Sequence, residues 1–523
     1  MSNPYFSVVT PVYRPEPGAL SATIDSVVGQ TFADWELILV DDHSDQEGVT
    51  EVLRRAAERD ERIRLVEREA NGGIVASSND GIDAARGEFV VLLDHDDLLT
   101  PDALERNHAV ISRHPNADYL YSDEDKVGED GRHYDEFRKP PWSPERLRAQ
   151  MYTSHLSVLR TALVREVGGF RDGFDGSQDH DLVLRVTERA RHVEHVPQVL
   201  YHWRASAGST AADLHAKSYA DDARRRAVQE QLDRLGIDAT AEIDPTTTFV
   251  RLRRSLDPET LVSVVIPTRG TAKQIWGEPR LLVLEAVRSV LERGGHDNLE
   301  FVVVYDLDTP DNVVEELQRL LGERLRLVPY DRPFNFSEKC NVGVLASQGT
   351  YVLLLNDDIE VRSEGFIPDL VAPLVESGVG LTGARLLFAD STIQHAGLGF
   401  HGQWPHHLSY GALEDDPGAY GLHRINREVS GVTGACVALR RETYDRVGGM
   451  TEALPVNFND VDFSLKVRHL GLRVLWIATA EAFHFESQTR DNKVQDWEKE
   501  ILRSRWWMPR TDEFVPDFTP QPR

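Results

Sequence analysis

Acidic side chains close two strongly apolar stretches of this sequence. The loop Asp94–Asp96 (Asp-His-Asp) follows the apolar run Phe89–Leu93, and the loop Asn356–Asp358 (Asn-Asp-Asp) follows a similar run later in the chain. Carboxylate and amide oxygens are the ligands that Mg²⁺ or Mn²⁺ prefers, and such a cation can in turn hold a diphosphate. An acidic turn can also be a simple solvated turn or a helix cap. The return of the same loop favours a metal site.

A second pair of carboxylates opens two predicted helices. Gln178-Asp179 and Asn459-Asp460 each stand just before a helical pattern. The N-terminus of a helix stabilises a carboxylate and keeps it ionised, which suits a general base. The same position also suits an ordinary N-cap. Because the amide–carboxylate step occurs twice, we expect Asp179 and Asp460 to be catalytic.

A histidine between aromatic residues follows each of these helices. His202 lies between Tyr201 and Trp203, and His484 lies between Phe483 and Phe485. Such a histidine is often only part of a core, but equivalent placement in two parts of the chain also fits a metal or phosphate ligand. Both interpretations stay open from the residues alone.

These motifs belong to a larger internal repeat. Four stretches of the first half return in the same order in the second half: Phe6–Tyr13 as Leu261–Thr268, Trp35–Asp42 as Leu299–Asp306, Gly87–Asp96 as Gly349–Asp358, and Val167–Leu182 as Val447–Phe463. Self-similarity of this kind indicates repeated structural units. We predict an N-terminal domain over 1–240, a linker over 241–259, a C-terminal domain over 260–496 and a Trp-rich tail over 497–523.

Short Val-, Ile- and Leu-rich runs alternate with helical patterns in each copy. Apolar strands separated by helices predict an α/β fold with a mostly parallel sheet covered on both faces. Ligands of such sheets bind outside the carboxyl ends of the strands. Asp42, Asp306 and both acidic loops fall at predicted strand ends, so each copy is expected to carry its own site.

Composition limits the partners and the compartment. The chain has 523 residues and a net charge of −28, from 86 acidic and 58 basic side chains. This charge repels phosphate backbones, so we expect no nucleic-acid partner. Two cysteines, no signal-peptide pattern and no long apolar segment predict a cytoplasmic protein, with at most a peripheral contact with the inner face of the membrane.

The ordered motifs resemble inverting family-2 glycosyltransferases of the GT-A fold. The most specific strings resemble tandem bacterial polysaccharide glycosyltransferases: Tyr121–Asp125, Gly176–Asp179 and Tyr201–Arg204 in the first copy, and Phe334–Ser337, Gln394–Gly397, Val432–Cys436 and Asn459–Asp462 in the second. The resemblance covers nearly the whole chain. It implies two tandem Rossmann-like nucleotide-sugar-binding domains, a Mg²⁺ or Mn²⁺ cofactor and a UDP- or dTDP-linked sugar donor. The implied acceptor is a glycan or lipid-linked glycan, as in O-antigen synthesis, with rhamnose as the suggested sugar.

The resemblance also implies a role for each matching residue. The nucleotide sugar would be bound by Pro11, Tyr13, Asp42 and Asp94 in the first copy and by Pro267, Asp306 and Asn356 in the second. The metal would be held by Asp96 and His202 in the first copy and by Asp358 and His484 in the second. Asp179 and Asp460 would be the catalytic bases.

Departures from the family pattern leave the two copies unequal. Asn356 stands where an aspartate is expected, and Tyr305 stands where the first copy has Asp41. One alternative is therefore that only one domain, the N-terminal one, is catalytic and that the other binds glycan or acts as a scaffold. A more remote alternative is a sugar nucleotidyltransferase, although neither copy carries the Gly-rich basic loop expected of one.

The tail has two interpretations. Its tryptophans and basic residues, from Trp497 to Arg510, suit a membrane interface. The same aromatic side chains also suit packing against the second domain.

Overall fold

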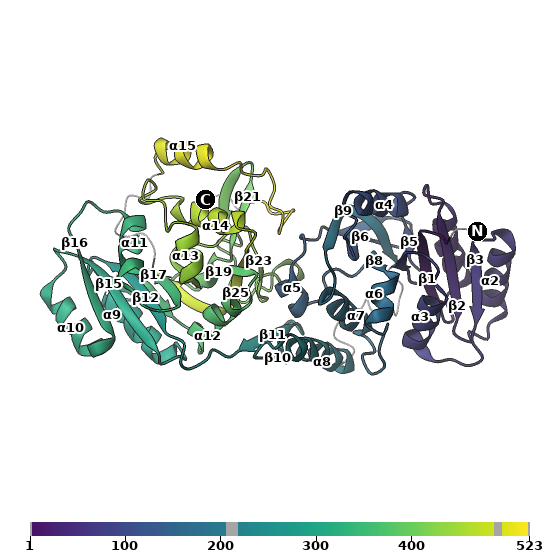
Figure 1. The fold of residues 1–523 in the computed structure, drawn as a ribbon, viewed down its shortest axis with the longest axis horizontal. Helices are drawn as coiled ribbons and strands as arrows, with labels where there is room; N and C mark the ends of the chain where they lie inside the picture. The colour runs from purple at the N-terminus through teal and green to yellow at the C-terminus, as the bar shows by residue number, and fades with distance from the viewer. Residues whose placement is uncertain (1–2, 205–217, 486–493, 521–523) are drawn as a thin grey trace. The chain divides into compact units, whose positions relative to one another are not determined.

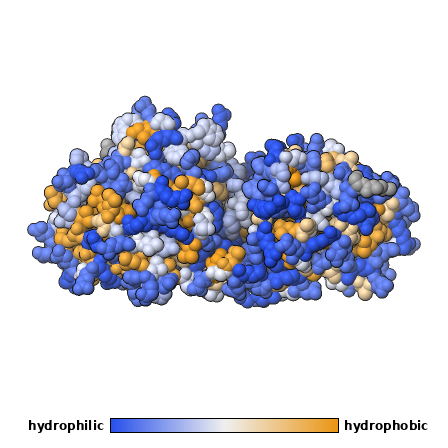
Figure 2. Space-filling view, viewed as in Figure 1, coloured by the Kyte–Doolittle hydropathy of each residue, from blue (hydrophilic) through white to orange (hydrophobic). Residues whose placement is uncertain are grey.

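A computed structural model describes residues 3–204, 218–485 and 494–520 (Figure 1). The chain divides into two compact units, one formed by residues 1–143, 147–237 and 241–250, and the other by residues 144–146, 238–240 and 251–523. No helix within the described ranges combines the length and apolar character needed to cross a bilayer. On the face drawn in Figure 2, polar side chains predominate and apolar ones form smaller groups.

The first half of the chain alternates strands and helices as the apolar runs predict. Its strands are β1 (Phe6–Val12), β2 (Trp35–Asp41), β3 (Ile63–Glu67), β4 (Phe89–Leu92), β5 (Leu98–Leu99), β6 (Tyr119–Val127), β7 (His133–Phe137), β8 (Ser157–Arg160) and β9 (Val193–Arg204). Its helices are α1 (Pro17–Val28), α2 (Glu47–Arg59), α3 (Gly73–Ala84), α4 (Ala103–Arg113), α5 (Pro144–Ala149), α6 (Thr161–Glu166), α7 (Gln178–Thr187) and α8 (Ser218–Leu235). The strands β10 (Ala239–Ile243) and β11 (Val250–Arg254) pair with each other in the predicted linker region.

The second half repeats this alternation with insertions. Its strands are β12 (Val262–Thr268), β13 (Ala272–Ile275), β14 (Glu278–Leu281), β15 (Leu299–Asp306), β16 (Leu325–Tyr330), β17 (Tyr351–Leu355), β18 (Ile359–Val361), β19 (Val379–Leu387), β20 (Ile393–His395), β21 (Leu398–His401), β22 (Trp404–His407), β23 (Arg427–Glu428), β24 (Cys436–Arg440) and β25 (Arg473–His484). Its α-helices are α9 (Leu282–Arg293), α10 (Asp311–Leu321), α11 (Phe336–Ala346), α12 (Phe366–Val371), α13 (Arg441–Arg446), α14 (Asn459–His469) and α15 (Asp496–Arg505). Short 3₁₀ turns are η1 (Gly322–Arg324), η2 (Ala372–Val375) and η3 (Ala419–Gly421).

The two large sheets have the same strand order. The first runs β3-β2-β1-β4-β8-β6-β9-β5 and the second runs β16-β15-β12-β17-β24-β19-β25-β18. In each sheet the first four strands are parallel, whereas the rest of the sheet mixes parallel and antiparallel pairs. The predicted fold class, α/β with two GT-A-type domains, is confirmed, and the antiparallel pairs are an addition to the predicted parallel sheet.

Matching side-chain contacts show that the two copies share details as well as topology. The Ser7 hydroxyl donates to Glu36 at 2.7 Å and accepts from the Gly87 amide at 2.8 Å. In the second copy the Ser263 hydroxyl donates to Glu300 at 2.5 Å and accepts from the Gly349 amide at 2.7 Å. Each serine thereby ties the central strand to both of its neighbours, as the repeated sequence stretches lead one to expect.

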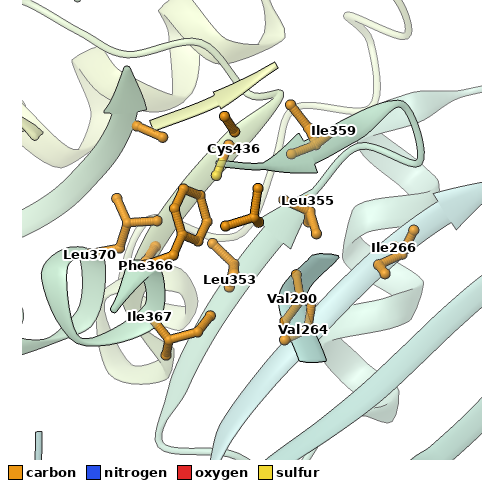
Figure 3. Packing of buried hydrophobic residues seen from close by; sticks show 14 of the residues in the cluster. Val264, Ile266, Val290, Leu353, Leu355, Ile359, Phe366, Ile367, Leu370 and Cys436 are labelled. Atoms are coloured by element: carbon orange, nitrogen blue, oxygen red, sulfur yellow. The ribbon is translucent and has the colours of Figure 1, made fainter. Parts of the chain in front are cut away.

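Both faces of each sheet are covered. In the second unit, Val264 of β12 joins one hydrophobic cluster with residues of α9, α10 and α12, while Val265 joins another cluster with residues of α11. Figure 3 shows Phe366, Ile367 and Leu370 of α12 beside Leu353 of β17 and Cys436 of β24 in the first of these clusters. Burial on both faces explains why the central strands read as continuous apolar runs without alternation.

One glycine in each unit lets a helix lie unusually close to the sheet. A Cβ atom on Gly81 of α3 would overlap the side chain of Val9, and a Cβ atom on Gly343 of α11 would overlap the side chain of Val265. Only a residue without a side chain permits this approach.

Candidate active sites in the two units

The acidic loop of the first unit is fastened to the carboxyl end of β1. The ring of His95 donates from Nδ1 to the carbonyl of Pro11 at 3.1 Å, and the Thr23 hydroxyl donates to the carbonyl of His95 at 3.0 Å. Tyr13, just beyond the strand, is 43% exposed. Pro11, Tyr13 and the acidic loop therefore lie at one edge of the sheet, where ligands of such sheets bind.

Three side chains at this edge could share one cation. Asp94, Asp97 and His155 each offer a ligand atom, and these atoms lie within 4.8 Å of one another. Asp97 was not among the predicted ligands. Asp96, a predicted ligand, is partly buried, and its backbone carbonyl accepts a hydrogen bond from Arg204 Nε at 2.7 Å.

Asp97 is held by groups from the end of β9. The Tyr201 hydroxyl donates to Oδ2 of Asp97, and the Arg204 amide donates to Oδ1 at 2.7 Å. Burial raises the pKa of Asp97, and the charge of Asp94 raises it further. A carboxyl group kept this close to another, and nearly inaccessible to solvent, gains strongly from a nearby cation.

Asp179 shares this electrostatic environment. Desolvation raises the pKa of Asp179 to about 6, and the charge of Asp94 is the next cause. The side chain is nevertheless exposed to solvent, so the surrounding protein desolvates it without closing it off. A solvent-exposed carboxylate whose pKa is raised toward neutrality is suited to take up a proton.

The nearby Asp181 has a different environment. It is fully buried and pairs with Arg185 one helical turn along, at 2.6 Å, and with Arg171. In the second unit Asp462 is equally buried and accepts hydrogen bonds from Arg505 and Trp506 at 2.6 and 2.8 Å. The second aspartate of each motif is therefore structural.

Asp42 lies in a closed cradle at the end of β2. It is 2% exposed and accepts hydrogen bonds from the side chains of Arg68 and Asn71 and from the amides of Gly72 and Gly73, at 2.9 and 2.8 Å for the two amides. Direct contact between Asp42 and a nucleotide base requires one of these donors to move.

His202 lies on β9 opposite Leu98 of β5, which follows the acidic loop. Its Nδ1 is 2.6 Å from Oδ1 of Asp125, and the ring of His133 approaches the other oxygen of Asp125 at 3.1 Å. The carboxylate of Asp125 thus accepts from two histidines on neighbouring strands. The described geometry does not group His202 with Asp94 and Asp97.

The second unit encloses a cavity of about 540 Å³. Five predicted site residues line it, from β12, the acidic loop, the start of α14 and the end of β25: Pro267, Asn356, Asp358, Asp460 and His484. Thr268, Lys339 and the aromatic side chains of Trp404 and Phe458 also line it. The cavity therefore brings the proposed metal ligands and the proposed base into one space.

Within this cavity the loop faces the histidine. Nε2 of His484 is 3.2 Å from Oδ1 of Asp358 and 3.4 Å from Nδ2 of Asn356. On the other side of the ring, Nδ1 of His484 is 2.7 Å from Oε1 of Gln394. Asn356 Oδ1 is buried and accepts no hydrogen bond from the described part of the chain.

This donor set fits a divalent cation. Asp358 contributes a carboxylate oxygen, Asn356 a buried amide oxygen, and His484 an imidazole nitrogen, all next to one open space. Oxygen with one nitrogen is a donor set that Mn²⁺ accepts readily, and Mg²⁺ prefers its oxygen members.

Asp460 is the second residue of α14, whose N-cap is Phe458, so the carboxylate lies in the first turn of the helix and not just before it. The Val461 amide donates to its Oδ1 at 2.8 Å and the Gly434 amide donates to its Oδ2 at 3.3 Å. These two amides fix the position of the carboxylate at the start of the helix.

Asp306, the counterpart of Asp42, is also paired with cations. Lys339 of α11 approaches its Oδ1 at 2.5 Å, and Arg269 approaches its Oδ2 at 3.2 Å. Lys339 is buried and also donates to the carbonyl of Thr268 at 3.1 Å. Burial lowers the pKa of Lys339, while Asp306 opposes this shift. Asp306 does not line the cavity, but its partner Lys339 does.

The fold defines a tandem GT-A protein, with one α/β domain and one candidate site in each half. The glycosyl transferase family 2 model matches residues 7–167 and again residues 263–448. The chain therefore belongs to glycosyl transferase family 2.

Two relatives align with almost the whole of this chain. An uncharacterised protein of Sinorhizobium fredii is 41% identical over 99% of this chain, and the O-antigen biosynthesis protein RfbC of Myxococcus xanthus is 34% identical over 93% of it. The aligned parts make up 58% and 38% of those two proteins, so this chain corresponds to only part of their length. Among solved structures, Staphylococcus aureus TarS 1–349 with UDP-GlcNAc matches 44% of this chain and 66% of its own, at 22% identity and a TM-score of 0.37.

Sequence reasoning missed Asp97, His155, Gln394 and Lys339. Asp97 follows the predicted loop directly, and Gln394 begins the string Gln394–Gly397, which resembles the family but predicts no role for the glutamine. Nothing local distinguishes His155 or Lys339. Their significance comes from strands and helices far away in the sequence.

Proposed function

We propose that this chain is a metal-dependent, inverting glycosyltransferase that moves sugars from nucleoside-diphosphate sugars to a growing glycan, using a site in each unit. The observation that carries the proposal is the cavity of the second unit, where Asp358 and His484 face each other and Asp460 lines the same space. Membership of glycosyl transferase family 2 supports the reaction class.

Asp460 and Asp179 are the proposed bases. Each would accept the proton of an acceptor hydroxyl as that oxygen attacks the anomeric carbon from the face opposite the diphosphate, so the product has the inverted configuration. The amides of Gly434 and Val461 donate to Asp460 and hold its carboxylate in place for this step. General-base assistance of this kind contributes about 10²–10⁴-fold.

The metal ligands proposed for the second unit are Asp358 and His484, with Asn356 beside them. In the first unit we propose the acidic loop, Asp94 and Asp96, with His202 as the counterpart of His484, and we add Asp97 from the cluster described above. Bound Mg²⁺ or Mn²⁺ would neutralise the charge that builds on the departing diphosphate.

The donor's nucleotide is proposed to lie at the ends of β1 and β2, and of β12 and β15. Pro11, Tyr13 and Asp42 would form that part of the first site, and Pro267 and Asp306 that of the second. Pyrimidine-linked donors, UDP- or dTDP-sugars, and rhamnosyl transfer are the specific form of this proposal.

The acceptor is proposed to be a glycan or lipid-linked glycan at the cytosolic face of the membrane. The similarity to an O-antigen biosynthesis protein supports a cell-surface glycan. In the tail, Trp506 binds Asp462, whereas Trp497 and Trp507 are 46% and 79% exposed. These exposed aromatic side chains are the surface that we propose for peripheral membrane contact.

Single and double base variants test the proposal. Asp179→Asn and Asp460→Asn should each remove transfer by one unit while Mn²⁺-dependent donor binding survives, and the double variant should release no nucleoside diphosphate. Because Asn356 replaces a carboxylate, catalysis by the first unit alone is the competing function; full activity of Asp460→Asn would support it. Release of pyrophosphate would identify a nucleotidyltransferase, and wild-type transfer by the double variant would refute the base assignment.

A further inference from the structure

Gln394 contacts His484, the histidine of the second site, through the ring nitrogen that faces away from Asp358. It stands in the middle of β20, a three-residue strand that pairs with β19, and it is 2% exposed. Its Oε1 lies 2.7 Å from Nδ1 of His484, and its Nε2 lies 3.4 Å from the carbonyl oxygen of the same residue. The amide therefore contacts the ring and the backbone of His484 together, which fixes the orientation of the imidazole.

This contact determines which ring nitrogen carries the proton. An amide oxygen can only accept, so Nδ1 of His484 must be the donor. In the neutral ring, Nε2 then carries the lone pair, and it is Nε2 that faces Oδ1 of Asp358 at 3.2 Å. Two ligands of one octahedral ion, each about 2.1 Å from it, lie about 3 Å apart. The spacing of these two acceptor atoms thus suits a shared cation.

We propose that Gln394 is a positioning residue that presents His484 Nε2 to the divalent cation of the second site. The inference rests on the proposed function, because it needs a cation between Asp358 and His484. A partner on the far nitrogen of a metal-binding histidine typically fixes its tautomer, and loss of that partner lowers metal affinity about 10–100-fold.

The first unit contains the same relationship with a different chemical group. Nδ1 of His202 is held at 2.6 Å by the carboxylate of Asp125, which also binds His133. Both copies therefore hold the same nitrogen of the corresponding histidine from another strand, one with an anion and one with a neutral amide. Gln394 orients its histidine without adding a negative charge to a cavity that Asp357, Asp358 and Asp460 already line.

The test is a Mn²⁺ titration of the full chain followed by electron paramagnetic resonance, without nucleotide sugar. Asp94→Asn/Asp96→Asn serves as the background, so that the signal reports the second unit. Gln394→Leu, which keeps the size but removes the acceptor, should weaken Mn²⁺ binding about 10–100-fold. Gln394→Glu keeps an acceptor and should bind Mn²⁺ at least as well as the parent. The matched control is Gln318→Leu at an exposed position of α10, which should change nothing.

Two further measurements keep the outcome decisive. Nitrogen-15 NMR of the histidine-labelled parent chain should show that Nδ1 of His484 is protonated and Nε2 is not, and His484→Gln assigns the signal. This measurement does not depend on whether the Gln394→Leu variant folds. The opposite tautomer, or unchanged Mn²⁺ affinity in a folded Gln394→Leu chain, would overturn the role of Gln394. If His484→Gln and Asp358→Asn themselves leave Mn²⁺ binding unchanged, the metal site of the proposed function fails instead.

Discussion

Asp181 and Arg185 form an ion pair inside the first unit, with 2.6 Å between Oδ2 and Nη2, while Asp179, two residues earlier on the same helix, remains open to solvent. Two aspartates of one short motif therefore have different environments. A spacing of two residues places them on roughly opposite sides of the helix. The same division separates Asp462 from Asp460.

The first prediction follows from this division. Asp181→Asn should lower the free energy of unfolding by about 3–5 kcal/mol, because it leaves the buried Arg185 without its charge partner. Urea denaturation of the chain measures this. Asp179→Asn is the matched control and should not lower the free energy of unfolding, because it removes an exposed carboxylate whose ionisation does not stabilise the folded chain. Equal stability of the two variants would show that the ion pair contributes nothing.

The second prediction concerns the titration of Asp179. Its pKa of about 6 lies above that of an ordinary aspartate, so between the two values the folded chain binds more protons than the unfolded chain. Stability therefore decreases as pH rises through this window, while the proportion of Asp179 able to accept a proton increases. Carbon-13 NMR of the metal-free chain should show a carboxyl group titrating near pH 6 that disappears in Asp179→Asn.

Asp94→Asn provides the control for this titration. Burial is the main cause of the shift and the charge of Asp94 is the second, so removing that charge should lower the pKa of Asp179 without restoring an ordinary value. A bound cation should act in the same direction. Titration of Asp179 near pH 4 in the metal-free parent would contradict the described environment.

The third prediction concerns Asn356, which stands where the first acidic loop has Asp94. Asn356→Asp should strengthen Mn²⁺ binding by the second unit about tenfold, since a carboxylate replaces the neutral amide beside His484. Calorimetric titration with Mn²⁺ in the Asp94→Asn/Asp96→Asn background measures the change. Weaker or equal binding would mean that Asn356 lies outside the coordination sphere.

The fourth prediction tests the close helix–sheet approach. Gly343→Ala should destabilise the chain by about 1–3 kcal/mol, because the added methyl group overlaps Val265. Gly81→Ala should do the same against Val9 in the first unit. Gly378→Ala is the control, because a Cβ atom there meets only the Arg473 side chain at 3.6 Å. Thermal unfolding compares the three variants, and a control as unstable as Gly343→Ala would refute the packing argument.

The strands and the repeat could be predicted because their cause is local. All seven residues of β1 are buried, so the run from Phe6 to Val12 is apolar enough to be recognised as a strand covered on both faces. The repeated order of motifs then predicts a second sheet of the same kind, and the matching strand orders confirm it.

The contacts that complete each site could not be predicted in this way. Gln394 and His484 are 90 residues apart, and they meet because β20 pairs with β19 and β19 with β25. Which of the two carboxylates, Asp96 or Asp97, joins the acidic cluster of the first unit is also decided by distant residues. It depends on Tyr201 and Arg204 at the end of β9, whose donors select one of two adjacent carboxylates. Such pairings depend on tertiary packing, which no pattern in the loop itself encodes.

The glycine under α3 also affects how the first site meets its donor. Gly81 lets α3 lie close to Val9 of the sheet, and the amides of Gly72 and Gly73 at the start of this helix donate to Asp42. That end of the proposed site is therefore organised by packing and hydrogen bonds within the first unit. Under the proposed function, adjustment to different sugars would then fall to the loop around Asp97 and to the segment that carries His155.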